Sequence, residues 1–313
     1  MNVNIGDPFK EFFVLLETVT SRFWVVGIDC FDWLPFCHGK TKYLVTESKG
    51  ARFELVPCNL NFDYKKAITF NPFRYTDQIS VPEMNGAAAW KFENATFRTV
   101  SIVPYPILEE YQKISGVIGL ARLNIQNEFT KNNPMRKAIH AGTPVITIAL
   151  PKLDTRREAV LTVGGHDNKS CILGSALSES VILNERYDFT YLSIQMGSLK
   201  FQSRAAAVAY PHISNSNIGV PKEFMQKILR KTGAKFDATT NKYLVNCNAN
   251  FDSLLLNTDS NGFAVEPEYF VRKHSVSFKF YAKYLNLLQR IAKKEKWKTL
   301  LDCDSQITTM LVL

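Results

Sequence analysis

The sequence predicts a globular protein that is built mainly from β-strands and has short helices. Residues 187–194 alternate with period two, and residues 143–150 form a run of alternating β-branched residues, both typical of strands. Near the amino terminus, an apolar stretch follows a Gly-Asp-Pro turn and ends at the acidic Glu17. The chain has 313 residues, of which 46% are hydrophobic, and this suits one large or two modest domains with buried cores.

The amino-terminal stretch resembles a known active-site strand. Gly-Asp-Pro at residues 6–8, the apolar stretch, Glu-Thr-Val-Thr-Ser at 17–21 and Phe-Trp-Val-Val at 23–26 follow one another. They are similar to the first active-site strand of the pepsin family of aspartic peptidases, where a Gly-x-Pro turn and an apolar strand lead into Asp-Thr-Gly-Ser-Ser and Leu-Trp-Val. The resemblance puts Glu17 in place of the first catalytic aspartate, followed by Thr18, and Val19 in place of the motif's glycine.

Further landmarks follow in the order that the pepsin family has them. Cys30 and Cys37 flank a proline, which suits a small disulfide loop, and the family has such a loop at this point. Residues 113–121, with Gly-Val-Ile-Gly-Leu-Ala, resemble the run that crosses behind the first catalytic loop, and their two glycines permit close backbone packing. Gly-Gly-His-Asp at 164–167 resembles the family's Gly-Gly-x-Asp turn, and the cysteine at 171 looks like its nematode branch.

The second active-site motif is located by the Gly-Val-Pro at residues 219–221, which is similar to the Gly-x-Pro that follows this motif in the family. Counting back without gaps puts His212 in place of the second catalytic aspartate, with Ile213 and Ser214 as its neighbours. Pro221 then starts a segment with apolar residues at helical spacing, which predicts a helix ending near Gly233.

The resemblance implies a mostly β, bilobal acid-protease fold with a central cleft. It divides the chain into an amino-terminal lobe, residues 1–182, and a carboxy-terminal lobe, residues 183–271. From residue 272 the resemblance stops, and residues 278–294 carry apolar side chains on one helical face. We therefore expect a divergent, basic and helical tail over 272–313 in place of the closing strands, although a divergent gene model or altered splicing would give the same ending.

The family's flap, a β-hairpin that carries a tyrosine and closes over the substrate, corresponds to about residues 70–89. Tyr75 is the natural candidate and Phe70 a second, but neither is followed by the family's Gly-x-Gly. Residues 129–142 are expected to form helix and turn, and residues 241–247 and 263–270 resemble later strands of the second lobe.

The six cysteines allow three disulfides. We expect a disulfide between Cys30 and Cys37 and a second between Cys247 and Cys303, and the pairing of Cys58 and Cys171 stays open. Asn94 and Asn168 begin glycosylation sequons. No Cys-x-x-Cys pair is present, and we expect neither a metal nor a cofactor.

The net charge of +9 is concentrated in one segment. Residues 272–298 hold nine Lys or Arg against one acid, so they carry +8 of the total, and the rest of the chain is nearly neutral. This distribution favours a solvated basic helix over a nucleic-acid site. The sequence shows no apolar run of 18 residues and no visible signal peptide. The resemblance implies a secreted or lysosomal protein, expected to be a monomer.

An aspartic peptidase activates water between two carboxylates that share one proton. Glu17 adds a methylene to the first, Val19 fills space that a glycine leaves open, and His212 removes the second carboxylate. We therefore expect a catalytically inactive homologue that keeps a cleft for a peptide or protein ligand. Two alternatives are a weak acid-range endopeptidase that uses the pair Glu17 and His212, and a degenerate gene copy without a stable product.

Overall fold

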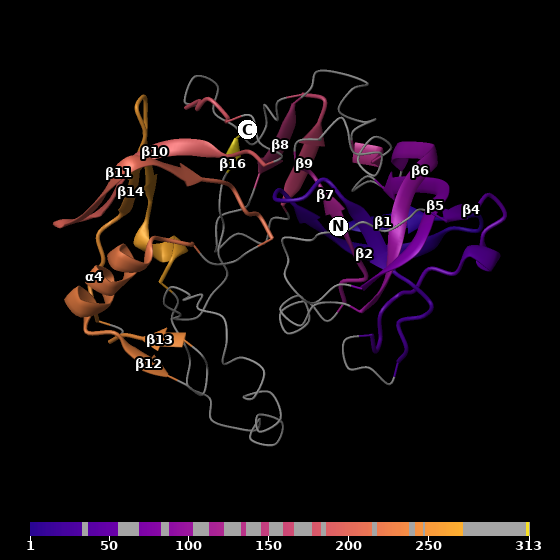
Figure 1. The fold of residues 1–313 in the computed structure, drawn as a ribbon, viewed down its shortest axis with the longest axis horizontal. Coiled ribbons are helices and arrows are strands. Elements are labelled where there is room, and N and C mark those ends of the chain that lie inside the picture. Colours follow the sequence, from indigo (N-terminus) through magenta and orange to yellow (C-terminus); the bar gives the residue numbers. More distant parts are fainter. Residues whose placement is uncertain are drawn as a thin grey trace.

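A computed structural model describes residues 1–32, 37–55, 69–82, 88–102, 113–121, 133–135, 145–149, 159–165, 177–182, 186–214, 218–237, 242–246, 248–271 and 311–312. These residues form a mostly β protein, as the sequence predicts (Figure 1). Most strands belong to a large sheet in the amino-terminal half and a smaller sheet in the carboxy-terminal half.

The amino-terminal half contains a seven-stranded sheet in the order β1-β2-β7-β3-β6-β5-β4. Strand β1 also pairs with β5, so the sheet curls back on itself into a barrel-like form. Strands β2 and β7, and likewise β3 and β6, pair in parallel, whereas β3 and β7 are antiparallel. The strands are β1 (Asn2–Ile5), β2 (Lys10–Glu17), β3 (Phe23–Val26), β4 (Arg52–Leu55), β5 (Thr69–Pro82), β6 (Ala88–Ile102) and β7 (Gly116–Gly119).

Alternating apolar residues of these strands point into one core. Phe12 and Val14 of β2 are buried, whereas Glu11 and Phe13 between them are exposed, which is the period of a half-buried strand. Phe12 packs in the same cluster as Ile79 of β5. On the other side of the sheet, Trp24, Val26, Val100, Val117 and the cysteines 30 and 37 form a second buried cluster.

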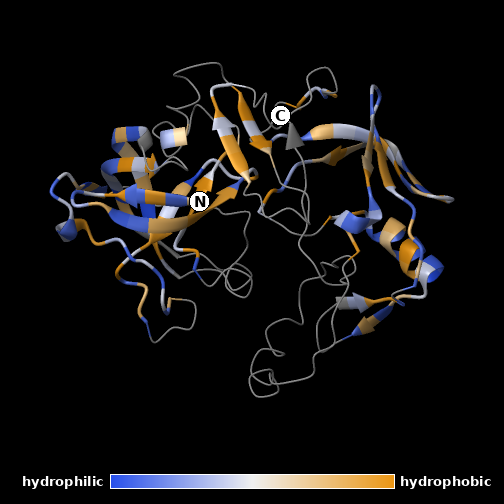
Figure 2. Ribbon diagram, turned by 180° about the vertical axis from the view of Figure 1, so that it is seen from behind, coloured by the Kyte–Doolittle hydropathy of each residue, from blue (hydrophilic) through white to orange (hydrophobic). Residues whose placement is uncertain are grey.

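The carboxy-terminal half has its own core between a sheet and a helix. Its four-stranded sheet runs β11-β10-β14-β15, and helix α4 (Lys222–Thr232) packs against it with Phe224 and Ile228 fully buried. Figure 2 shows apolar residues on one side of this helix. The strands are β10 (Phe189–Met196), β11 (Leu199–Ala209), β14 (Leu254–Asn257) and β15 (Gly262–Val265), with the pair β12 (Lys235–Asp237) and β13 (Lys242–Leu244) nearby.

Helix α4 starts within one residue of the prediction and stops where the sequence predicts. Gly233 ends it with φ of +65°, a left-handed conformation that glycine adopts without a Cβ penalty. The predicted strands at 143–150 and 187–194 are present as β8 (Ile146–Ala149) and β10. Two short 3-10 helices are also present, η1 (Val45–Glu47) and η2 (Pro267–Tyr269).

A third sheet contains β8, β9 (Val160–Val163) and β16 (Leu311–Val312), in the order β16-β8-β9. The sequence did not predict β16, which pairs antiparallel with β8. The predicted amphipathic helix at 278–294 lies outside the described residues, as does most of the predicted helix at 129–142. Within the described part of the chain, no helix is both long and apolar enough to cross a membrane.

Candidate active site

Glu17 is the last residue of β2, and its position is fixed by backbone pairing with β7. Glu17 lies opposite Gly119 in the parallel ladder, and the N–H of Leu120 donates to its carbonyl oxygen at 2.7 Å. The Glu17 side chain is 12% exposed, so the sheet delivers a nearly buried carboxylate to the strand end.

We call residues 18–22, which follow Glu17, the first site loop. Gly119 packs directly under it: a Cβ there would overlap the carbonyl oxygen of Thr20 and lie 2.5 Å from the amide nitrogen of Arg22. Gly116 has the same role beside β3, where a Cβ would lie 2.6 Å from the carbonyl oxygen of Trp24. The close packing predicted for the two glycines is thus confirmed.

Asn133 holds the first site loop against β7. Its amide nitrogen donates to the carbonyl oxygens of Ser21 at 2.7 Å and of Gly119 at 3.1 Å, and its side-chain oxygen accepts from Met135. The residue is 2% exposed. Sequence reasoning missed Asn133, because its partners lie in a loop far away in the chain and a single asparagine in a predicted helix gives no signal.

His212 lies in the stretch that follows β11, residues 210–214, which we call the second site loop. Thr18 connects the two loops: its hydroxyl donates to the carbonyl oxygen of Pro211 at 2.6 Å and accepts from the N–H of Ile213 at 3.3 Å. Thr18 is 1% exposed. This buried hydroxyl therefore forms hydrogen bonds to the residues on both sides of His212 and brings the two predicted half-motifs together.

The two substituted positions are in direct contact. The His212 imidazole Nε2 lies 3.4 Å from the Glu17 carboxylate Oε1, close enough for an ion pair when the imidazole is protonated. The Ser214 hydroxyl donates to the same oxygen at 3.4 Å. The imidazole of His212 and the hydroxyl of Ser214 thus both contact one oxygen of the Glu17 carboxylate. The sequence places all three residues in the two active-site motifs, but it does not predict the contact between Ser214 and Glu17.

Val19 and Ser214 stand where the family has glycine, and Ile213 stands where it has threonine. Val19 is half-buried in the first site loop. Ile213, between His212 and Ser214, packs against the core of the amino-terminal half. Ile213 has no hydroxyl, so its side chain cannot form a hydrogen bond to the first site loop in the way that Thr18 bonds to the second. At these two positions the side-chain hydrogen bonds between the loops therefore come from Thr18.

Tyr75 lies in β5 opposite Phe53 of β4, and its ring packs at 5.4 Å from Tyr43 and 6.1 Å from Phe97. Burial is the main cause that raises its pKa above the ordinary value. The structure thus places Tyr75 beside the amino-terminal core, and its role as a flap residue stays a prediction. Phe70 also lies in β5.

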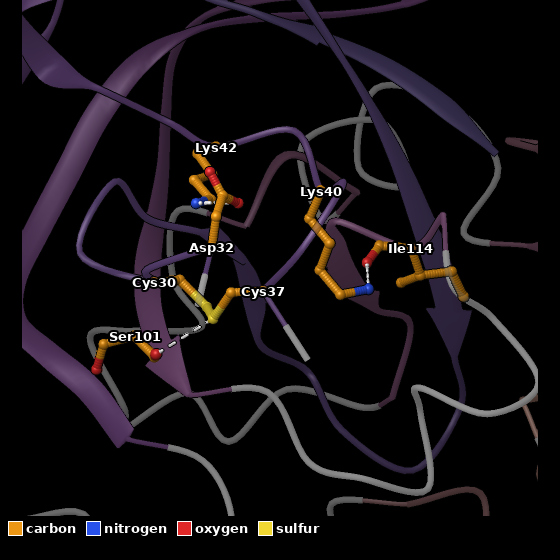
Figure 3. The surroundings of a disulfide bond; sticks show 7 residues. All are labelled: Cys30, Asp32, Cys37, Lys40, Lys42, Ser101 and Ile114. Carbon is orange, nitrogen blue, oxygen red and sulfur yellow. Dashed lines mark hydrogen bonds and ion pairs between the residues drawn. A yellow bond between two sulfur atoms is a disulfide. The ribbon is translucent and has the colours of Figure 1, made fainter. Parts of the chain in front are cut away.

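Cys30 and Cys37 form the predicted disulfide, with Cα atoms 5.5 Å apart and both residues fully buried (Figure 3). Beside it, the Lys40 ammonium donates to the carbonyl oxygen of Ile114 at 2.6 Å. Asn94 is exposed on β6. The cysteines at 58, 171, 247 and 303 and the asparagine at 168 lie outside the described residues.

The fold and the site define a class of protein. A barrel-like sheet that delivers Glu17 to one loop, joined by a buried threonine to a second loop from the other half, is the frame of an acid protease. The chain matches the eukaryotic aspartyl protease family over residues 1–295 and belongs to that family. The match includes residues 272–295, beyond the point where the sequence predicted the resemblance to stop.

A relative within this family is Aspartic protease 6 of Caenorhabditis elegans. The two chains are 21% identical over 281 residues, which cover 85% of this chain and 67% of that protein. The predicted resemblance to the pepsin family is therefore confirmed.

Proposed function

We propose that this protein is a pepsin-family homologue that does not cleave peptides by the aspartic mechanism and retains a cleft for a peptide or protein ligand. The observation that carries the proposal is the contact of His212 with Glu17 at 3.4 Å. Two carboxylates at this distance would have to share a proton, whereas an imidazolium beside a carboxylate forms an ion pair. The pair therefore lacks the second carboxylate, and with it the shared proton of the aspartic mechanism.

The geometry around the pair supports the same conclusion. The oxygen of Glu17 that faces His212 also accepts from Ser214, a contact that a glycine at position 214 could not make. Val19 and Ser214 add side chains where the family has glycine. A displacement of about 1 Å at such a site lowers the rate about a hundredfold, and here the groups themselves also differ.

A weak endopeptidase is the second candidate, favoured by the same contact. Glu17 next to His212 is a carboxylate and imidazole pair within reach of a water molecule, and either group is a competent general base. In this case Glu17 would activate the water and a protonated His212 would stabilise the developing charge. Like the family, the protein is proposed to be secreted or lysosomal and monomeric.

The test is digestion of an acid-unfolded protein substrate from pH 2.5 to 7, with and without a pepstatin-type inhibitor. We expect no cleavage by the wild-type protein. A restored variant, Glu17→Asp with Val19→Gly, His212→Asp, Ile213→Thr and Ser214→Gly, rebuilds Asp-Thr-Gly in both motifs and is expected to give cleavage that the inhibitor blocks. Calorimetric binding of the inhibitor to the wild-type protein then measures whether the cleft still holds a peptide.

The outcomes separate the candidates. Wild-type cleavage that is lost in Glu17→Ala would establish the weak endopeptidase and reject the main proposal. Inhibitor binding without cleavage supports a binding module. A restored variant that is folded but neither cleaves nor binds would show that the cleft has been lost as well as the chemistry.

A further inference from the structure

Ser214 is a polar side chain of the site to which the proposed function assigns no reaction. It stands two residues after His212, at the position where the family's motif has glycine, so its hydroxyl is an addition to the family's site. The hydroxyl is partly buried and lies 3.4 Å from Oε1 of Glu17, to which it donates. Since Glu17 is nearly buried at the end of β2, the acceptor of this proton is held by the sheet.

A hydroxyl that donates to a carboxylate, which is in turn contacted by a third group, has the arrangement of an activated nucleophile. Here His212 contacts the same carboxylate oxygen at 3.4 Å and is 29% exposed, so it lies on the solvent side of the pair. Both contacts are long for strong hydrogen bonds. Catalytic hydrogen bonds are often loose in structures without a ligand and shorten when a substrate is bound.

We infer that Ser214 is a nucleophile that accepts acyl groups from carboxylic esters with a good leaving group, with Glu17 as its general base and His212 as the third group, which contacts that base. This goes beyond the peptide-binding role and does not depend on it. The class of substrate follows from the base, because a carboxylate assists attack on an activated ester more readily than on an amide, whose leaving group is poor.

The proposed reaction is balanced by water as the second substrate. The Ser214 oxygen attacks the ester carbonyl carbon, and its proton passes to the Glu17 carboxylate. The bond to the leaving alkoxide then breaks, and Glu17 returns the proton to it. In the second half, water attacks the acyl-serine, Glu17 takes a proton from the water, and that proton goes to the serine oxygen as the acid departs.

The chain contains a matched control in Ser253. Its hydroxyl donates to the carboxylate of Glu266 at 2.7 Å, a shorter contact than that between Ser214 and Glu17, but the pair is exposed to solvent. If a serine next to a glutamate were sufficient, Ser253 would react at least as well. A reaction confined to Ser214 would show that burial of the base and the neighbouring imidazole make the difference.

The experiment treats the full-length protein with a fluorophosphonate probe, in which the serine oxygen displaces fluoride from phosphorus, and maps the labelled peptide by mass spectrometry. We expect one label per molecule, on Ser214. The mapping is done on the wild-type protein, so it does not depend on the folding of a variant. Glu17→Gln is expected to slow labelling about a hundredfold, the usual contribution of a general base, and Ser253→Ala to leave it unchanged.

A second readout follows the release of 4-nitrophenolate from 4-nitrophenyl acetate. We expect a burst of about one equivalent from the wild-type protein and none from Ser214→Ala. Failure to label Ser214 in a folded sample at saturating probe, or equal labelling of Ser253, would overturn the inference. Either result leaves the digestion and inhibitor-binding tests of the proposed function untouched, so the two ideas fail separately.

Discussion

Replacing Thr18 by valine tests whether one buried hydroxyl joins the two site loops. Valine keeps the β-branched shape of threonine, so the change removes the hydroxyl and leaves the packing volume almost unchanged. Two contacts disappear: the donation to Pro211 at 2.6 Å and the acceptance from Ile213 at 3.3 Å. Both partners come from the second site loop, almost 200 residues away in the chain, as the separations of 193 and 195 residues show.

The expected cost follows from what is left behind. The carbonyl oxygen of Pro211 is buried and would lose the hydroxyl that satisfies it, which costs about 1–3 kcal/mol. The longer contact with Ile213 is partly buried and adds about 0.5–1 kcal/mol. We therefore expect Thr18→Val to lower the free energy of unfolding by about 1.5–4 kcal/mol.

Urea denaturation monitored by intrinsic fluorescence measures this difference, with Thr20→Val as the matched control. Among the described residues, the Thr20 hydroxyl is seen to accept from the N–H of Arg22 at 3.3 Å within its own loop, so its loss is expected to cost less than about 1 kcal/mol. The His212 imidazole resonances are also expected to shift in Thr18→Val and not in the control. Equal costs for the two variants, with unchanged His212 resonances, would refute the reasoning.

Three further predictions concern other parts of the fold. Gly119→Ala forces a Cβ into the backbone of the first site loop and is expected to destabilise the protein by about 3 kcal/mol or more in thermal unfolding. Its control, Gly165→Ala, has open space around the new Cβ and is expected to change stability by less than about 1 kcal/mol, so equal effects would contradict the packing argument. Tyr43→Phe removes the hydroxyl that donates to the buried Asp77 carboxylate at 2.8 Å and is expected to cost about 1–3 kcal/mol by urea denaturation, and no measurable loss would contradict it. Burial lowers the pKa of Lys40 in the folded protein below its ordinary 10.5, so as the pH approaches 10.5 from below the unfolded chain binds more protons than the folded protein. The free energy of unfolding of the wild-type protein is therefore expected to rise with pH relative to that of Lys40→Met, and a difference that is constant with pH would refute this.

Much of the frame could be predicted because local sequence determines it. Strands β8 and β10 follow from alternating residues, and α4 follows from a proline at its start and Gly233 at its end. The positions of Glu17 and His212 followed from ordered landmarks, and the structure brings them into contact. In each case the signal lies within a short window of the chain or in the spacing of several windows.

The remaining features depend on contacts between distant parts of the chain. Asn133 braces the first site loop across 112 residues, and nothing near it in the sequence marks this. Tyr75 is the candidate flap residue because the family's flap carries a tyrosine, and this role stays a prediction; the packing of its ring against Tyr43 and Phe97 could not be read from the sequence. Ser214 was marked only as a motif neighbour, since sequence alone could not show that its hydroxyl reaches Glu17.

The contacts explain how the frame of an aspartic peptidase can persist when its catalytic groups change. Thr18 grips backbone atoms of the second site loop, and Leu120 donates to the backbone of Glu17. None of these contacts requires a carboxylate at position 17 or 212, so replacing the aspartates removes the shared proton and leaves the loops joined. The buried ends of the strands then hold whichever side chains replace them, here Glu17 and His212, close together. Selection for the fold therefore does not protect the original chemistry, and a new polar contact such as that of Ser214 can arise in the same place.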